Sequence, residues 1–402
     1  MKKVMILGAG PLQLPTIRKA KENGLYVISL DYDPDAVGFN YADEKLLIST
    51  IDKDAVLSAA KKLKPDVVMT STAEGPVVTV AYVNTKLSKP LDISYEDSLC
   101  ATNKALMRDR LKANNIPIPH YRKIYSLSEC IDCIEEYKLP FIIKPADNAA
   151  SRGVCLVEDK SVDNITKLYN YCIKYSRSGV VLLEEFMTGA EVSVESFNIN
   201  RQTQILAITD KMVTPIPYFV ELGHAEPSQL SDDIQDEIRE ITKKTIKAIG
   251  VINGPTHTEI KITPEGPKVV EIAARLGGDN ITSKLVPLST GIDLTDCCIR
   301  QAVGDDIDLT PKFSRGAAIR YVESDPGVIE HIFIDGAINN IMDIDDVSIY
   351  KHVGDKVDIL KNSNDRIGHV IAIGKNTQAA IDNCMSALKY IHIATSHDYT
   401  GA

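Results

Sequence analysis

The chain has 402 residues, 44% of them hydrophobic, and carries a formal net charge of -10. This length and composition allow two to four domains with real cores, and the acidic balance argues against sequence-independent nucleic-acid binding, which needs a basic surface. No run reaches the roughly 20 apolar residues of a membrane span, and the N-terminal segment turns glycine-rich too soon for a signal peptide, so we expect a cytoplasmic globular protein.

Residues 1–100 alternate short apolar runs with helical patterns, which is typical of βαβ units around a parallel sheet. Ligands of such sheets bind at the carboxyl ends of the strands. The candidate contacts there are Gly8, Gly10, Asp31 and Glu74. The two glycines and Asp31 match part of a dinucleotide fingerprint, but Gln13 takes the place of its third glycine. A plain strand-to-helix turn beside a ligand cleft is therefore favoured over NAD binding.

The next part of the chain predicts one helix and then a small unit of its own. Segment 98–119 is typical of a helix closed by a proline-punctuated stop, which suggests a connection into a new domain. Residues 138–197 then alternate strand, loop, strand, a helix near 161–175, and strand, as in a compact α+β unit. Two cysteine pairs have no second Cys or His pair nearby, so we interpret them as buried reduced thiols: Cys130 with Cys133, and Cys297 with Cys298.

Two segments of this unit could contact a nucleotide. Lys144 ends an apolar strand before loop 147–153, whose backbone N–H groups and Ser151 hydroxyl could surround phosphates, although a strand-end lysine can equally be solvated. The strand that ends in LLEEF carries polar groups that could reach an adenine edge, and Glu191 follows for a ribose. The same pattern also fits an ordinary strand end with solvated glutamates.

Residues 254–275 predict a β-hairpin, because two runs with β-type alternation flank a TPEGP turn. Folding about Glu265 sets Glu259 opposite Glu271. On the period-2 rule, one face of the first strand presents His257, Glu259 and Lys261. The corresponding face of the second strand presents Glu271, Ala273 and Arg275.

The opposed glutamates predict a bound cation. Like charges directly opposed on a sheet destabilise it by roughly 0.2–1 kcal/mol when exposed and more when buried, so something positive is expected between them. Carboxylates together with nucleotide phosphates are typical ligands of Mg²⁺. Arg275 would then lie beside the metal as a planar fork for a carboxylate or phosphate. The alternative is a solvent-facing hairpin with scattered charges.

The remaining segments complete four expected domains. A larger α/β region at about 190–305 contains the hairpin and the helix GIDLTDCCIRQAVG, and the strand-like AAIRYVES opens the last segment. The expected boundaries are 1–100, 101–188, 189–310 and 311–402.

In order and spacing, these segments resemble an ATP-grasp enzyme from residue 1 to about 305. The residues that carry the resemblance are Lys104, Lys144, Glu184 to Glu191, Glu259, Glu271 and Arg275. Within that superfamily, GHAEPS at 223–228, the HTE strand, EIAARLGGD followed by TGID, and DRIGHVIAIG look like L-amino-acid ligases and carbamoyl-phosphate-synthase-like carboxylate-amine ligases. The resemblance implies an α/β fold with an N-terminal parallel (pre-ATP-grasp) domain, a small α+β lid, a larger α+β ATP-grasp domain and a C-terminal α+β subdomain.

The resemblance also implies site residues. ATP phosphates would be held by Lys104, Lys144 and the flap 147–153, with its Ser151 and Gly153. Adenine would be read by the Glu184 side chain and the backbones of Glu185 and Met187, and the ribose by Glu191. One or two Mg²⁺ (or Mn²⁺) ions would be bridged by Glu259 and Glu271, and Arg275 would grip the carboxylate being phosphorylated.

Three departures from the family pattern stand out. Ala273 replaces the asparagine of EINAR and removes an amide that commonly assists a second metal. The flap is rich in alanine instead of glycine, which should stiffen it. Asn115 replaces the usual glycine after the helix, a small change because asparagine also accepts the left-handed conformation.

Three further residues could serve the substrates. His224 could contact a substrate or take a proton from the attacking amine, or be bonded within its own loop. His257 shares the face of Glu259, which favours a supporting role over metal ligation. Glu74 ends a strand of the first domain and could bind a substrate amino group.

The implied activity is ATP-dependent amide formation between a small-molecule carboxylate, expected to be an amino acid, and an amine, through an acyl phosphate. Such chemistry needs cations around the transferring phosphoryl oxygens and no protein nucleophile. The alternatives are a purine-pathway ligase such as phosphoribosylglycinamide synthetase, an ATP-binding module without turnover, and a nicotinamide dehydrogenase. Neither nucleic acid nor membrane is an expected partner, and the oligomeric state stays open, with a homodimer as one option.

Overall fold

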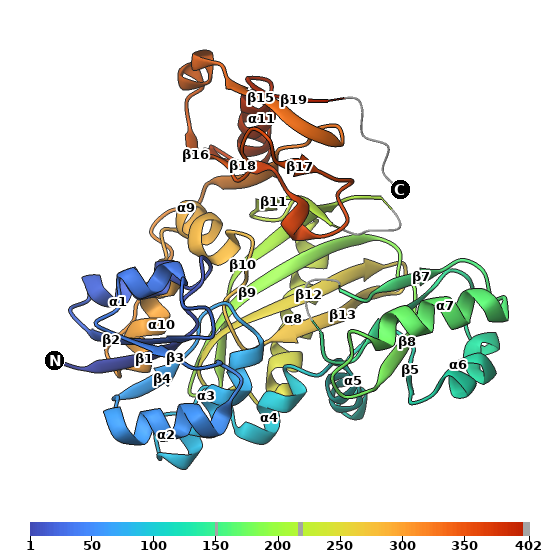
Figure 1. The fold of residues 1–402 in the computed structure, drawn as a ribbon, viewed down its shortest axis with the longest axis horizontal. Helices are drawn as coiled ribbons and strands as arrows, with labels where there is room; N and C mark the ends of the chain where they lie inside the picture. Colours follow the sequence, from blue (N-terminus) through green and yellow to red (C-terminus); the bar gives the residue numbers. More distant parts are fainter. Residues whose placement is uncertain (149–151, 216–219, 397–402) are drawn as a thin grey trace.

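The computed structural model describes residues 1–148, 152–215 and 220–396. Figure 1 shows an α/β domain at the N-terminus, a small lid on the opposite side, and a long central sheet that connects both to the C-terminal region. Among the described residues, no helix combines the length and the apolar character that crossing a bilayer requires.

The N-terminal domain is a parallel sheet, as predicted, and its strand order is β3-β2-β1-β4. Its elements are β1 (Lys3–Leu7), α1 (Leu14–Glu22), β2 (Tyr26–Asp31), β3 (Glu44–Leu47), α2 (Lys53–Leu63), β4 (Val67–Met69) and α3 (Gly75–Lys86). Met5 and Leu7 pack with α2 and α3, whereas Val4 and Ile6 pack in a second core with α1 and α10 (Leu294–Ala302). Both faces of the sheet are therefore covered, which explains the uninterrupted apolar run of β1.

Asp31 holds the turn after β1 in place. Its Oδ2 accepts a hydrogen bond from the N–H of Ala9 at 2.8 Å, and its Oδ1 accepts one from the N–H of Asp33 at 3.1 Å. Gly8 has φ = +107°, in the region that favours glycine. One carboxylate oxygen of Asp31 thus binds the turn after β1 and the other binds the loop that follows β2, as in a plain strand-to-helix turn.

The lid is a four-stranded antiparallel sheet with strand order β5-β8-β6-β7. Two linker helices lead into it, α4 (Tyr95–Cys100) and α5 (Lys104–Ala113). The lid elements are β5 (Tyr121–Ile124), α6 (Leu127–Cys133), β6 (Phe141–Pro145), β7 (Cys155–Val157), α7 (Val162–Ile173) and β8 (Val181–Glu185). Cys130 and Cys133 are buried in the lid core, as expected of structural thiols. Asn115 has φ = +55°, so it takes the left-handed conformation predicted for it.

The central sheet is antiparallel with strand order β13-β12-β9-β10-β11-β14-β18-β16. Its first strands are β9 (Ala190–Ile199), β10 (Gln202–Val213), β11 (Glu221–Glu226), β12 (Gly254–Thr263) and β13 (Gly266–Ala273). Helix α8 (Asp232–Ile249) covers one face of this sheet, where its Ile238 and Ile241 share a hydrophobic core with Val192 and Val194 of β9. The other face of β9 carries Phe197, which packs in the core shared with α10 and the N-terminal sheet.

The C-terminal region continues the same sheet. Its elements are η3 (Ile281–Leu285), α9 (Val286–Thr290), β14 (Gly316–Tyr321), β16 (Ile344–Ile349), β18 (Gly368–Gly374) and α11 (Thr377–Leu388). A small separate sheet contains β15 (Gly327–Ile334), β17 (Lys356–Val357) and β19 (Ile391–Thr395). Single 3-10 turns lie at Val37–Asn40, Ile134–Glu136, Gly336–Asn340 and Ser363–Asp365. Because β14, β16 and β18 extend the central sheet, the boundary expected at residue 310 is not a boundary between sheets.

Glu226, at the end of β11, predicts a pH-dependent stability. The side chain is fully buried and accepts hydrogen bonds from Thr209 Oγ1 at 2.7 Å and Ser289 Oγ at 2.6 Å. Burial raises its pKa to about 7, although the two hydroxyls oppose the shift. The folded state therefore holds this proton more tightly than the unfolded state, and stability is lost as pH rises from about 4.5 through 7.

We expect Glu226→Gln to remove this loss. Between pH 5 and pH 8 the free energy of unfolding should fall by about 2–3 kcal/mol less in the variant than in the wild type. Denaturant titrations at the two pH values measure the difference, with Glu237→Gln on the exposed side of α8 as the matched control. If the free energy of unfolding changes equally between pH 5 and pH 8 in the wild type and in Glu226→Gln, the buried carboxyl does not titrate in this pH range.

Candidate active site

The hairpin β12–β13 places Glu259 directly opposite Glu271, as predicted. The pairing of the two glutamates does not arise from a simple fold of the chain about Glu265. Pairing runs from Thr263 with Gly266 to Ile260 with Val269, and a bulge between Glu259 and Ile260 then shifts the register by one residue. Without that bulge the two glutamates would not be paired, so the irregularity creates the juxtaposition.

Each of the two opposed carboxylates is bound by a lysine. Glu271 Oε1 lies 3.0 Å from Lys104 Nζ, and Glu259 Oε1 lies 3.0 Å from Lys211 Nζ. The Lys211 side chain is 4% exposed and also contacts Glu191 at 2.6 Å and Glu221 at 3.7 Å. Burial would lower the pKa of Lys211, but these three carboxylates outweigh it and raise the pKa well above its ordinary value. Lys211 is therefore a permanent cation beside Glu259.

His257 supplies a second positive charge next to Glu259. Its Nδ1 lies 2.5 Å from Glu195 Oε1, and its Nε2 lies 3.6 Å from Glu259 Oε1. Burial lowers the pKa of His257, but Glu195 and Glu259 more than compensate and raise it to about 9. Burial in turn would raise the pKa of Glu259, yet Lys211 and His257 hold it well below its usual range. Glu259 is thus fully ionised at neutral pH.

A buried ion-pair network ties the lid to the hairpin. Arg108 is fully buried and binds both oxygens of Glu184, at 2.8 Å and 3.2 Å, while Lys144 Nζ lies 2.7 Å from Glu184 Oε2. Arg108 also donates to the backbone carbonyls of Val269 at 3.3 Å and Val270 at 2.8 Å, next to the bulge. Burial raises the pKa of Glu184, but the two cations override it and lower the pKa to about 2.

This network bears on the adenine contacts expected at the end of β8. Both side-chain oxygens of Glu184 are bound by Arg108 and Lys144. A hydrogen bond from adenine to that side chain would therefore require one of these ion pairs to break. The N–H of Glu185 donates to the carbonyl of His120 at 2.9 Å, and its side chain lies 2.6 Å from Lys268. Met187 is half-buried just beyond the strand. Adenine binding by the backbones of Glu185 and Met187 stays a prediction.

Lys104 connects the expected phosphate flap to the hairpin. Its Nζ donates to the carbonyl of Asn148 at 2.9 Å and to Glu271 at 3.0 Å. Burial lowers the pKa of Lys104, but Glu271 and Glu74 outweigh it and the pKa is raised. Ser151 lies outside the described residues. Gly153 has φ = +81°, and a Cβ there would lie 2.9 Å from Tyr175 Cβ, so this end of the flap requires glycine.

Lys144 and Glu191, both expected to contact ATP, are bound to side chains in this structure. Lys144 is 8% exposed, and burial lowers its pKa; Glu184 opposes that shift, whereas Arg108 and Lys104 reinforce it. Glu191 contacts Lys211 at 2.6 Å and Lys261 at 3.2 Å. Their roles at the phosphates and the ribose stay predictions.

Glu74 and Arg275 face the same group of charges from the first domain and the end of the hairpin. Burial, reinforced by Glu271 and opposed by Lys104 and Arg275, raises the pKa of Glu74 to about 7. Arg275 donates from Nη1 to the carbonyl of Leu276 at 2.9 Å, and its buried Nε has no partner among the described residues. Ala273, opposite His257, is buried and supplies no polar group there.

His224 belongs to a second polar cluster that reaches the C-terminal region. Its side chain is 1% exposed, its Nε2 lies 3.4 Å from Asp279 Oδ2, and its Nδ1 has no partner in the described parts of the chain. Asp279 binds Arg366 through two contacts of 3.0 Å, and Arg366 also binds Glu221 at 2.8 Å. Glu221 in turn adjoins Lys211, so this cluster is continuous with the carboxylates of the hairpin.

Sequence reasoning missed several of these residues. Arg108 lies four residues after Lys104, on the same face of α5, and this helical spacing was a usable signal. Lys211 shares a strand face with Thr209, but the strand order that brings it to Glu259 is not visible in the sequence. The same holds for Glu195, Glu221, Asp279 and Arg366.

The oxygen ligands present fit Mg²⁺ only in combination with phosphates. Among the described residues, no group of three or more His, Cys, Asp or Glu side chains is arranged to hold a metal ion by itself. Glu259 and Glu271 nevertheless offer two opposed carboxylates on adjacent strands, and Mg²⁺ is commonly held by one or two carboxylates together with substrate phosphates. The pair therefore fits a metal that arrives with a nucleotide.

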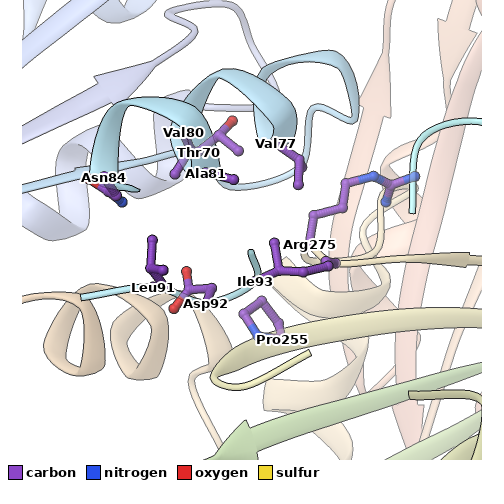
Figure 2. Close-up of a pocket in the computed structure, with 11 residues that line it drawn as sticks. Thr70, Val77, Val80, Ala81, Asn84, Leu91, Asp92, Ile93, Pro255 and Arg275 are labelled. Carbon is purple, nitrogen blue, oxygen red and sulfur yellow. The ribbon is translucent and has the colours of Figure 1, made fainter. Parts of the chain in front are cut away.

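A pocket lies beside this site, between the first domain and the start of the hairpin (Figure 2). Helix α3 contributes Val77, Val80, Ala81 and Asn84, and the facing side is formed by residues 91–93 and Pro255. Arg275 and Ala274 also line it. The pocket thus adjoins the group formed by Glu74, Arg275 and Glu271.

Comparison with known proteins gives two family matches. Residues 137–283 match the ATP-grasp domain, and residues 320–396 match the L-amino acid ligase C-terminal domain 2. An uncharacterized protein of Sinorhizobium fredii is 29% identical over 369 residues, which cover 89% of this chain and 75% of that protein. Alanine–anticapsin ligase of Bacillus subtilis is 28% identical over 231 residues, which cover 52% of this chain and 48% of the ligase, about half its length.

Two solved structures are similar along nearly the whole chain. The L-amino acid ligase from Bacillus licheniformis has a TM-score of 0.83 at 20% identity and covers 99% of both chains. A phosphoribosylglycinamide synthetase from Anaerococcus prevotii has a TM-score of 0.78 at 22% identity and covers 98% of this chain and 100% of that one. At these identities the likeness concerns the fold.

Proposed function

We infer that this chain, which carries an ATP-grasp domain and an L-amino acid ligase C-terminal domain 2, is an ADP-forming carboxylate–amine ligase that activates an amino acid with ATP. One observation carries the proposal: Glu259 and Glu271 are opposed on the hairpin, with Lys104 on one of them and Glu74 and Arg275 next to them. This combination supplies ligands for a metal–nucleotide complex and a cation for a substrate carboxylate.

The chemistry of the reaction explains why these charges are needed. A carboxylate is a poor electrophile, so one of its oxygens first attacks the γ-phosphorus of ATP, and ADP leaves. The amine nitrogen then attacks the acyl carbon and loses a proton, the amide bond forms, and inorganic phosphate leaves. Negative charge accumulates on the phosphoryl oxygens in the first step, and fixed cations aimed at that charge are the main source of catalysis in such sites.

The chain's own residues have distinct roles in this proposal. Glu259 and Glu271 would hold Mg²⁺ together with the nucleotide phosphates, and the metal would neutralise charge on the transferring group. Lys211 and His257 keep Glu259 ionised and in position. Lys104, which links the flap residue Asn148 to Glu271, is suited to bind a phosphate oxygen.

Arg275 and Glu74 would orient the amino acid. Arg275 offers a planar guanidinium for the carboxylate, and its buried Nε has no partner among the described residues. Glu74, close enough to feel the charges of Glu271 and Arg275, could bind the amino group of the same substrate. His224 is fully buried and contacts Asp279, so we assign it to positioning Asp279 instead of to direct proton transfer.

A purine-pathway ligase is the second candidate, because a phosphoribosylglycinamide synthetase shares the fold. The sugar phosphate of its amine would need cations in the first domain. The side chains that line the pocket there include Asp92, and among the described residues its only cationic lining residue is Arg275. Arg18 lies on α1 and is bonded to Tyr41. These charges favour an amino-acid substrate.

A phosphate-release assay tests the proposal. With Mg-ATP, we expect release to require amino acids, supplied singly and in pairs, and to stop when EDTA removes the metal. Release only with glycine and phosphoribosylamine would favour the purine-pathway alternative. If ATP protects the protein against heat but no mixture of amino acids gives phosphate release, the protein would instead be an ATP-binding module. Ala273 gives a reason for that outcome, because it removes an amide that commonly assists a second metal.

A further inference from the structure

Arg366 connects the C-terminal region to two carboxylates beside the active site. Its side chain is 5% exposed and lies just before β18. Nη1 and Nη2 each lie 3.0 Å from an oxygen of Asp279, and Nη2 also lies 2.8 Å from Glu221 Oε2. The centre of the guanidinium lies 3.8 Å from the centroid of the Tyr321 ring. Binding two carboxylates and an aromatic face at once needs a planar group with several donors, which lysine does not have.

Asp279 occupies a backbone conformation that L-amino acids rarely adopt. Its φ is +51°, and Asn280, the next residue, has φ = +63°. Asp and Asn tolerate this left-handed region better than other non-glycine residues, but usually as single residues. Such conformations persist where surrounding contacts fix them, and they are frequent at functional sites. The Asp279 carboxylate is fixed by Arg366 and by His224, whose Nε2 lies 3.4 Å away.

The loop that contains Asp279, residues 276–280, lies against the hairpin. A Cβ at Gly277 would come within 2.7 Å of His257 Nδ1, so the backbone of the loop is in close contact with the imidazole. The loop also follows Arg275 directly in the chain. Its position therefore affects both the arginine proposed for the substrate carboxylate and the histidine beside the opposed glutamates.

Glu221 extends the contacts of Arg366 toward the hairpin by a second route. One of its oxygens faces Arg366, and the other, Oε1, lies 3.7 Å from Lys211 Nζ. Lys211 Nζ in turn lies 3.0 Å from Glu259 Oε1. In a buried row of alternating charges, loss of one member leaves its neighbours uncompensated. Arg366 therefore bears on the position of Lys211 at Glu259.

We propose that Arg366 is a positioning residue of the ligase site. Through Glu221 it supports the lysine that binds Glu259, and through Asp279 it holds loop 276–280. It acts through these carboxylates and not on the reacting atoms. This inference rests on the proposed ligase function and assigns the C-terminal region a part in that site.

Phosphate release with Mg-ATP and amino acids measures the effect on turnover. Arg366→Lys keeps the charge but not the planar fork, and Arg366→Ala removes both. We expect kcat to fall about 10–100-fold in each variant, the usual cost of losing a residue that orients a ligand. Arg315→Ala is the matched control, because Arg315 also lies over a ring, Phe313 at 4.8 Å, and donates to the carbonyl of Leu288 at 2.7 Å. Its kcat should match that of the wild type.

Chemical rescue separates positioning from general stability. Ethylguanidine should occupy the space vacated in Arg366→Ala, bind Asp279 and Glu221, and raise kcat about 10-fold. Ethylammonium carries the same charge without the planar fork and should not. The assay is run at a temperature where circular dichroism shows the variant folded without either compound. A variant damaged only in stability would be fully active there and would not respond to ethylguanidine.

Binding of Mn²⁺ with ADP, followed by electron paramagnetic resonance, gives a readout that needs no turnover. Because Arg366 supports Glu259, the Kd of Mn²⁺ should rise about 10-fold in both variants and recover with ethylguanidine in Arg366→Ala.

Two results would overturn the inference and leave the ligase function standing. One is wild-type kcat and Mn²⁺ affinity in Arg366→Lys, and the other is lost activity in Arg366→Ala that ethylguanidine does not restore. If no amino acid gives phosphate release but the Mn²⁺ affinity changes as expected, the ligase function is wrong and the positioning role of Arg366 stands. No phosphate release together with unchanged Mn²⁺ affinity would overturn both.

Discussion

Replacing Glu271 by glutamine is expected to lower phosphate release by about 10³-fold, the scale of losing a main electrostatic contact to a transferring group. The substitution keeps the size of the side chain but removes one of the two opposed charges that would hold Mg²⁺ with the nucleotide. It also leaves Lys104 without its carboxylate partner at 3.0 Å. Steady-state phosphate release at saturating Mg-ATP measures the effect.

The same hairpin provides the control for this variant. Glu265 lies at the tip and is 72% exposed on its side chain, where it contacts Lys268 at 2.9 Å. Glu265→Gln makes the same chemical change on the same element, and its activity should stay within about twofold of the wild type because exposed ion pairs contribute little. Unchanged activity in Glu271→Gln, with both variants folded, would contradict the metal assignment.

Replacing Arg108 by methionine is expected to destabilise the protein by about 3–5 kcal/mol, the usual result of breaking a buried ion pair from one side. Among the described residues, the variant would leave Glu184 with Lys144 as its one remaining ionic partner, and the carbonyls of Val269 and Val270 would lose their hydrogen bonds from the guanidinium. Because the guanidinium joins lid and hairpin, the urea midpoint should fall, and lid residues should lose protection from amide exchange.

Arg110 supplies the comparison on the same helix. Its side chain is 33% exposed and pairs with Asp97 at 2.8 Å, so Arg110→Met should cost about 1 kcal/mol or less. A double variant, Arg108→Met with Glu184→Met, should lose further stability, because it leaves the buried ammonium of Lys144 without its carboxylate partner at 2.7 Å. Equal urea midpoints for the Arg108 and Arg110 variants would show that the buried ion-pair network does not stabilise the packing of the lid on the hairpin.

The parts of the fold predicted correctly are those encoded by local pattern. The parallel sheet, the helix after Asn103, the lid and the hairpin are all visible as runs and periods within short segments. The ATP-grasp fold predicted from the order of its motifs agrees with the family match over 137–283 and with the solved structures. The pairing of Glu259 with Glu271 was also predicted, although it depends on a bulge that the sequence does not reveal.

The charges around those glutamates could not be predicted, because they come from segments far apart in the chain. Lys104 meets Glu271 across 167 residues, and Arg366 meets Asp279 across 87. Lys211 reaches Glu259 only because β9 lies between β10 and β12 in the central sheet. The order of strands in a sheet depends on the tertiary fold, so it cannot be predicted from a short stretch of the sequence. In this structure each of the two glutamates lies beside a lysine, and the metal ion expected between them stays a prediction.

The central claim, that a substrate carboxylate is activated by phosphorylation, is tested most directly by following one oxygen atom. An amino acid labelled with ¹⁸O in its carboxylate is incubated with Mg-ATP and an amine, and the inorganic phosphate is analysed by mass spectrometry. The account predicts one ¹⁸O atom in the phosphate for each amide formed, because the bridging oxygen of the acyl phosphate leaves with phosphorus. Amide formed with unlabelled phosphate would contradict it.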